Sequence, residues 1–110
     1  MADVNNILDN LYDIIQDRKK NPPKKSYVVH LMNGGIEKMV SKITEESAEL
    51  AESVVEDDPR HVVYEAADLF FHILVLLGYK DIHPDLVLKE LERRFGKSGI
   101  TEKEERTKGK

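Results

Sequence analysis

The segment from Pro59 to Leu77 constrains the fold most, because apolar residues would cover most of its circumference as a helix. Positions 62, 63, 66, 67, 69–71 and 73–76 are all apolar. A helix that is apolar nearly all round is buried on several sides. A chain of 110 residues can build only a thin core. We therefore expect a second subunit to cover part of this helix.

Three further segments carry a single apolar stripe at helical spacing. The first begins near residue 4 and ends at 21–23, the second runs from about residue 36 to about 56, and the last starts near Pro84. Ser26 is placed to cap a short helical turn that begins at Tyr27. Asp57-Asp58-Pro59 separates the two longest segments, and proline suits a first helical turn. The predicted fold class is all-α, a bundle of four main helices completed by dimerisation.

Composition fits one helical domain. Hydrophobic residues make up 40% and charged residues 35% of the chain, a mixture typical of amphipathic helices. We expect the domain to span residues 1–95. Residues 96–110, rich in Gly, Lys and Glu, would form a mobile C-terminal tail of the same domain.

Charge and cysteine content exclude several classes of function. The formal net charge is −4, and no cluster of Lys and Arg suggests a nucleic-acid partner. The absence of cysteine excludes disulfides, thiolate catalysis and thiolate zinc sites. No basic segment followed by an apolar one opens the chain, and the longest apolar run, residues 73–77, is too short to cross a bilayer. We expect a soluble cytoplasmic protein with no membrane partner.

Carboxylates recur on the second and third helical segments. The second segment carries Glu45, Glu46 and Glu49, and the third carries Glu65 and Asp68. Residues three or four apart share one face of a helix, so two antiparallel helices would bring these acids together. A solvated surface explains the glutamates alone, but acids on an apolar helix are costly unless something compensates them. Clustered carboxylates suit a hard divalent cation with oxygen ligands.

The histidines are less informative. His72 lies one turn beyond Asp68, where it either donates to that carboxylate or is a satisfied core histidine. We assign no function to His30, His61 or His83. Di-iron helical bundles need Glu-x-x-His on two helices, and this sequence contains no Glu-x-x-His.

The pattern Glu-Glu-x-x-Glu, followed about one helix later by Glu-x-x-Asp, resembles the signature of the all-α nucleotide pyrophosphohydrolases. That superfamily includes MazG-like enzymes and dimeric dUTPases. Within it, the flanking segments resemble the phosphoribosyl-ATP pyrophosphatase family, although Val28 replaces a threonine and Phe71 stands where tyrosine is frequent. The resembling segments cover nearly the whole chain: Ser26-Tyr27, Lys42, residues 65–72, 75–77 and 90–96, then Gly99, Glu102-Lys103 and Arg106.

The resemblance implies a homodimer that splits phosphoribosyl-ATP into phosphoribosyl-AMP and pyrophosphate, the second step of histidine synthesis. Mg²⁺ would be the cofactor, with Glu46, Glu49, Glu65 and Asp68 as its ligands. The candidate catalytic residues are Glu45, Glu46 and Lys42, and the sequence leaves open which acid activates water. Lys42 is also a candidate for binding substrate, together with Ser26, Tyr27, Arg93, Arg94, Lys103 and Arg106.

Two other functions fit parts of the sequence. A general (d)NTP pyrophosphohydrolase of the MazG-like type would share the acidic motif, and only the flanking segments argue against it. A non-catalytic helical dimer would explain the helices but not the acids on the apolar third segment. Turnover of phosphoribosyl-ATP compared with a panel of (d)NTPs separates all three.

Overall fold

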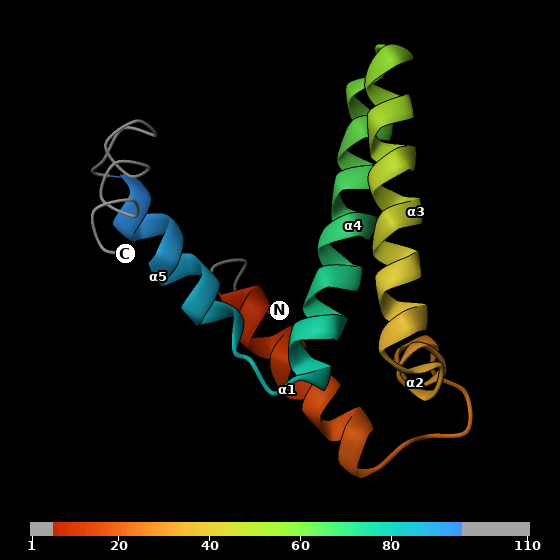
Figure 1. The fold of residues 1–110 in the computed structure, drawn as a ribbon, viewed down its shortest axis with the longest axis vertical. Coiled ribbons are helices and arrows are strands. Elements are labelled where there is room, and N and C mark those ends of the chain that lie inside the picture. The colour runs from red at the N-terminus through yellow and green to blue at the C-terminus, as the bar shows by residue number, and fades with distance from the viewer. Residues whose placement is uncertain (1–5, 96–110) are drawn as a thin grey trace, which may run out of the picture.

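The computed structural model describes residues 6–95, and this range contains five helices and no strand (Figure 1). The helices are α1 (Ile7–Lys20), α2 (Tyr27–Asn33), α3 (Gly35–Val55), α4 (Pro59–Tyr79) and α5 (Pro84–Phe95). The predicted all-α class is confirmed, and α2 is the short turn expected after Ser26. The tail expected at 96–110, with Lys103 and Arg106, lies outside the described residues.

Local sequence explains where the helices begin. The Ser26 hydroxyl accepts a hydrogen bond from the Val29 amide at 3.3 Å and so caps α2. The Asp58 carboxylate accepts one from the Arg60 amide at 3.1 Å and caps α4, whose first residue is Pro59. The Ser26 cap and the first-turn position of Pro59 follow the sequence prediction.

Helices α3 and α4 run side by side as a long antiparallel hairpin, as Figure 1 shows. Helix α1 packs across the C-terminal part of α4, α2 lies beneath the start of α3, and α5 packs mainly against α1 and diverges from the hairpin. The core lies where α1, α2, α3 and α4 meet. Its buried apolar residues are Ile15, Leu31, Met32, Met39 and Val75.

The end of α4 is held by side chains from α1. Gln16 Nε2 donates to the Gly78 carbonyl at 2.8 Å, and Lys19 Nζ donates to the carbonyls of Gly78 and Tyr79. The last carbonyls of a helix lack partners within the helix. Lys19 supplies one to the Tyr79 carbonyl, and the Gly78 carbonyl also accepts from the Asp81 amide at 3.1 Å. Lys19 also pairs with Asp81 at 2.6 Å. Helix α1 therefore acts as the C-terminal cap of α4.

Within one chain, part of the apolar surface of helix α4 is left exposed. Val63, Tyr64 and Phe70 are 68%, 67% and 63% exposed. The reason is geometric, because α3 covers one side of α4 and α1 reaches only its C-terminal part. By length and composition α4 could also cross a membrane, but the central helix of a protein in water passes the same test, and α4 turns Glu65 and Asp68 toward α3.

Candidate active site

The pairing of α3 with α4 brings four carboxylates together. Glu46 and Glu49 from α3, and Glu65 and Asp68 from α4, each offer an oxygen, and these oxygens all lie within 4.8 Å of one another. The i, i+3 spacing on each helix directs both of its acids to the same side. Glu46 is 4% exposed and Glu65 is 7% exposed. The two predicted pairs therefore form one cluster, half of it buried.

Two oxygens in this cluster have no hydrogen-bond partner. They are Oε2 of Glu46 and Oε2 of Glu65, and both are buried. A buried carboxylate oxygen without a partner is costly. A cation bound by this cluster would compensate the buried carboxylates, and a donor set made entirely of carboxylate oxygens suits a hard divalent ion such as Mg²⁺. The residues present therefore fit a divalent cation.

Electrostatics in the cluster reflect the crowding of like charges. Burial raises the pKa of the Asp68 carboxyl, and the neighbouring Glu46 carboxyl raises it further. On the same face, Lys42 Nζ lies 3.0 Å from Glu45 and 3.4 Å from Glu46. Its hydrogen bond to Glu45 raises the pKa of Lys42 well above the usual value. Lys42 is therefore a fixed positive charge at the edge of the cluster.

Glu45 differs from the other three glutamates of the motif pair. Its side chain is 57% exposed and contacts Lys42 rather than the four-carboxylate cluster. That position agrees with the helical phase, which turns residue 45 away from the apolar stripe. Glu45 is thus available to solvent next to a charged lysine, one residue from a buried cluster member.

Tyr27 and His72 form a second polar group beside the cluster. The Tyr27 hydroxyl lies 2.9 Å from His72 Nε2, and His72 Nδ1 lies 2.7 Å from the backbone carbonyl of Asp68. The sequence allowed a hydrogen bond from His72 to the Asp68 carboxylate, but that oxygen is 3.7 Å away, which is too far for a hydrogen bond. The imidazole instead binds the carbonyl one turn earlier in its own helix.

His61 contacts the cluster as well, although no function was expected for it from the sequence. Its Nε2 lies 3.4 Å from Glu65 Oε1, and its Nδ1 lies 2.6 Å from Glu56 Oε2. The Glu56 carboxylate raises the pKa of the His61 imidazole. The signal was present in the sequence, since residues 61 and 65 stand one helical turn apart.

The candidate arginines are not part of this group. Arg93 and Arg94 lie on α5, which diverges from the α3–α4 hairpin (Figure 1). They pair with Glu90 at 2.6 and 2.8 Å and lower the pKa of its carboxyl to about 2. The described residues thus place these two predicted substrate contacts on a separate helix from the carboxylates.

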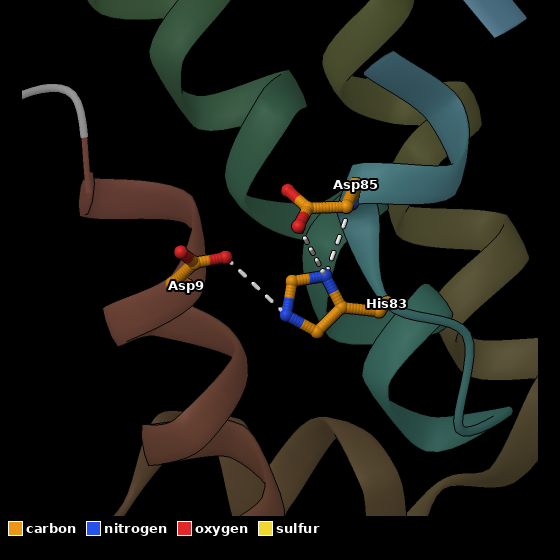
Figure 2. A group of neighbouring side chains, drawn as sticks. All are labelled: Asp9, His83 and Asp85. Atoms are coloured by element: carbon orange, nitrogen blue, oxygen red, sulfur yellow. Dashed lines mark hydrogen bonds and ion pairs between the residues drawn. The ribbon is translucent and has the colours of Figure 1, made fainter. Parts of the chain in front are cut away.

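A second acidic group joins α1 to the start of α5. His83 Nε2 lies 3.3 Å from Asp9, and His83 Nδ1 accepts a hydrogen bond from the Asp85 amide at 3.1 Å (Figure 2). The Tyr12 ring packs on the imidazole at 4.5 Å. The side chains of Asp9 and Asp85 are 51% and 54% exposed, so solvent already satisfies them. This group therefore links α1 to the start of α5.

Fold and site together define an all-α protein with a four-carboxylate site between two antiparallel helices. A family model described as phosphoribosyl-ATP pyrophosphohydrolase matches residues 8–95. The chain belongs to this family, and the family resemblance seen in the sequence motifs is confirmed.

Individual relatives agree with the family model. The chain is 50% identical over 100 residues to the phosphoribosyl-ATP pyrophosphatase of Geotalea daltonii, covering 91% of this chain and 94% of the relative. It is 47% identical over 107 residues to that of Pelobacter propionicus, covering 97% and 99%. It is also 45% identical over 103 residues to a histidine biosynthesis bifunctional protein of Helicobacter hepaticus, covering 94% of this chain and 45% of the relative.

Proposed function

We propose that this chain hydrolyses phosphoribosyl-ATP to phosphoribosyl-AMP and pyrophosphate, the second step of histidine biosynthesis, in the cytoplasm. Family membership and the names of the relatives support the reaction. The observation that carries the proposal is the convergence of four carboxylates from α3 and α4, with two buried oxygens that lack a partner.

Magnesium is the cofactor in this proposal, held by Glu46, Glu49, Glu65 and Asp68. When bound, it would neutralise charge on the phosphate chain of the substrate. The two unpartnered oxygens and the all-oxygen donor set support this assignment.

The chain's own residues supply the remaining roles. Lys42 stays charged beside Glu46 and would contact phosphate oxygens, which carry negative charge in both ground and transition states. Glu45, exposed next to Lys42, would orient water for attack. Ser26 and Tyr27, at the start of α2, would contact the nucleoside. Roles for Arg93, Arg94, Lys103 and Arg106 remain predictions, as does the division into a domain at 1–95 and a tail at 96–110.

Turnover of phosphoribosyl-ATP, measured beside a panel of ordinary (d)NTPs, tests this function. We expect magnesium-dependent release of pyrophosphate from phosphoribosyl-ATP, loss of that release in chelator, and little turnover of the panel. A clear preference for an ordinary dNTP would show that the chain acts as a general pyrophosphohydrolase. Absence of turnover with every nucleotide would favour the non-catalytic dimer.

The active form in this proposal is a homodimer. Exposed apolar side chains on the hairpin and on α5 support it, including Val55 at 84% and Phe95 at 93% exposed. A second chain would bury these side chains, and each Å² of buried apolar surface would stabilise the dimer by about 25 cal/mol. Sedimentation equilibrium at micromolar concentration is expected to give twice the mass of the chain. A stable folded monomer would contradict the dimer without touching the proposed reaction.

A further inference from the structure

The hydrogen-bond partners of His72 determine which of its ring nitrogens carries the proton. Its Nδ1 lies 2.7 Å from the Asp68 carbonyl oxygen, and a carbonyl oxygen can only accept. The proton of the neutral imidazole must therefore reside on Nδ1. Because a neutral imidazole carries one N–H, Nε2 is left with a lone pair.

That lone pair fixes the Tyr27 hydroxyl. Tyr27 Oη lies 2.9 Å from His72 Nε2, so the hydroxyl donates its single proton to the imidazole. Its oxygen then offers only lone pairs to any other group. Burial enforces this polarity, since His72 is 3% exposed and its ring nitrogens already have these partners.

The Tyr27 oxygen lies beside the carboxylates, because its partner His72 has a ring nitrogen within 4.8 Å of oxygens of Glu46 and Asp68. Tyr27 is 48% exposed, whereas the imidazole that holds it is buried. Its ring runs nearly parallel to that of Phe71, with centroids 6.2 Å apart and planes at 16°.

We infer that His72 is a positioning residue that makes the Tyr27 oxygen an acceptor for a hydrogen-bond donor of the nucleotide. The inference rests on the proposed function, because it concerns how that substrate is held. The donor is a ribose hydroxyl or a base amino group. A phosphate oxygen has no proton to give, so this oxygen selects the nucleoside part of the ligand rather than the phosphate chain.

Two substitutions at residue 72 separate the two hydrogen bonds. In His72→Gln, Oε1 replaces Nε2 and keeps the acceptor for Tyr27, whereas in His72→Asn, Nδ2 replaces Nδ1 and keeps only the donor to Asp68. Tyr27→Phe removes the hydroxyl itself. Loss of one neutral hydrogen bond to the substrate weakens its binding by roughly 3- to 10-fold. We expect Tyr27→Phe and His72→Asn each to raise KM for phosphoribosyl-ATP by that factor with kcat nearly unchanged, and His72→Gln to stay near wild type.

The double variant tests whether His72 acts through Tyr27. If it does, His72→Asn added to Tyr27→Phe raises KM no further. Multiplying KM effects would overturn the inference, as would equal losses in His72→Asn and His72→Gln. Thermal melts identify a variant that fails to fold. If a substitution at residue 72 fails in this way, Tyr27→Phe, at an exposed position, still tests the inference.

A spectroscopic readout needs no substrate. Long-range ¹H–¹⁵N spectra of the metal-free protein at pH 8 distinguish the two imidazole tautomers. We expect His72 in the Nδ1–H form, and an Nε2–H or doubly protonated ring would overturn the inference. Wild-type protein that fails to turn over phosphoribosyl-ATP, yet shows the Nδ1–H tautomer, would instead reject the proposed function.

Nucleotide inhibitors identify the donor. Tyr27→Phe should be inhibited less strongly by AMP than wild type is. If a ribose hydroxyl is the donor, wild type and variant should be inhibited equally by 2′,3′-dideoxy-AMP. If the base amino group is the donor, they should be inhibited equally by IMP. Both results support an acceptor oxygen. An unchanged weakening with both analogues would show that Tyr27 does not accept from the nucleoside.

Discussion

Replacing Asp68 by Asn should abolish turnover while leaving the metal-free protein as stable as wild type, or more stable. Asp68 is one of four carboxylates whose oxygens lie within 4.8 Å of one another. Burial and then Glu46 raise its pKa, so the ionised form is less favourable in the folded chain than in the unfolded one. Asparagine keeps the shape and removes the charge, but it weakens a proposed magnesium ligand.

The direction of the pKa change fixes the pH window of this effect. A raised pKa means that the folded chain binds the Asp68 proton more tightly than the unfolded chain does. This tighter proton binding stabilises the folded chain fully at a pH below the pKa that Asp68 has in the unfolded chain. The stabilisation is lost as pH rises through the pKa that Asp68 has in the folded chain. The Asp68 side chain is 34% exposed, so water screens the repulsion and the gain in stability should be modest. The advantage of Asp68→Asn should therefore appear at neutral pH and vanish near pH 3.

Thermal melts in chelator and in excess magnesium measure both halves of this prediction. A ligand at 100 times its Kd stabilises the folded form by about 2.7 kcal/mol. Wild type should gain a stabilisation of this order from magnesium, and Asp68→Asn much less. Asp13→Asn is the matched control, because Asp13 is exposed on α1, and it should keep the full magnesium response. A variant at Asp68 that loses equal stability in both conditions and stays active would refute the metal site.

Three further changes test the rest of the structure. A Cβ at residue 78 would lie 2.5 Å from Ile15 Cγ2, so Gly78→Ala should lower the free energy of unfolding by about 1–3 kcal/mol; denaturant melts equal to wild type would show that α1 and α4 pack differently. Lys19→Met removes the donor to the Gly78 and Tyr79 carbonyls and should cost about 1 kcal/mol in the same assay, whereas no change would mean that water replaces the ammonium. Lys42→Met removes the charge beside Glu45 and Glu46 and should lower kcat/KM for phosphoribosyl-ATP at least 10-fold with little effect on melting, and full activity would exclude Lys42 from phosphate binding.

The sequence predicts those parts of the site that depend on helical spacing. Glu46 with Glu49, and Glu65 with Asp68, are each one turn apart, and any two antiparallel helices in register bring them together. The caps at Ser26 and Asp58 are likewise local, since each side chain bonds an amide two or three residues away. Interactions as local as these can be predicted before the fold is known.

Contacts between distant segments could not be predicted in this way. The hydroxyl of Tyr27 meets an imidazole 45 residues later, and Lys19 meets a carbonyl 59 residues later. Each depends on how α1 and α2 dock against α4, which no periodicity specifies. The last helix shows the same limit. Its apolar stripe predicts that α5 packs against another element, but it does not identify α1 as the main contact.

The core also sets the geometry of the site, through the register of two helices. The buried residues of α3 are Met39, Glu46 and Ser53, at intervals of seven, and Glu65 and His72 are buried at the same interval on α4. A seven-residue repeat is typical of a seam between two packed helices. Glu46 and Glu65 therefore occupy seam positions that an ordinary helix pair fills with apolar side chains.

Apolar packing at one end of this seam holds like charges together in its middle. Met39 on α3 and Val75 on α4 belong to the core and are 2% and 0% exposed. A rotation of either helix by one residue would turn these side chains out of the core, at about 1.5–3 kcal/mol for each side chain exposed. Lys42 contacts one oxygen of Glu46 and His61 contacts one oxygen of Glu65, and the core packing holds the helices in register, so the Oε2 atoms of both glutamates remain unpaired and available to a cation.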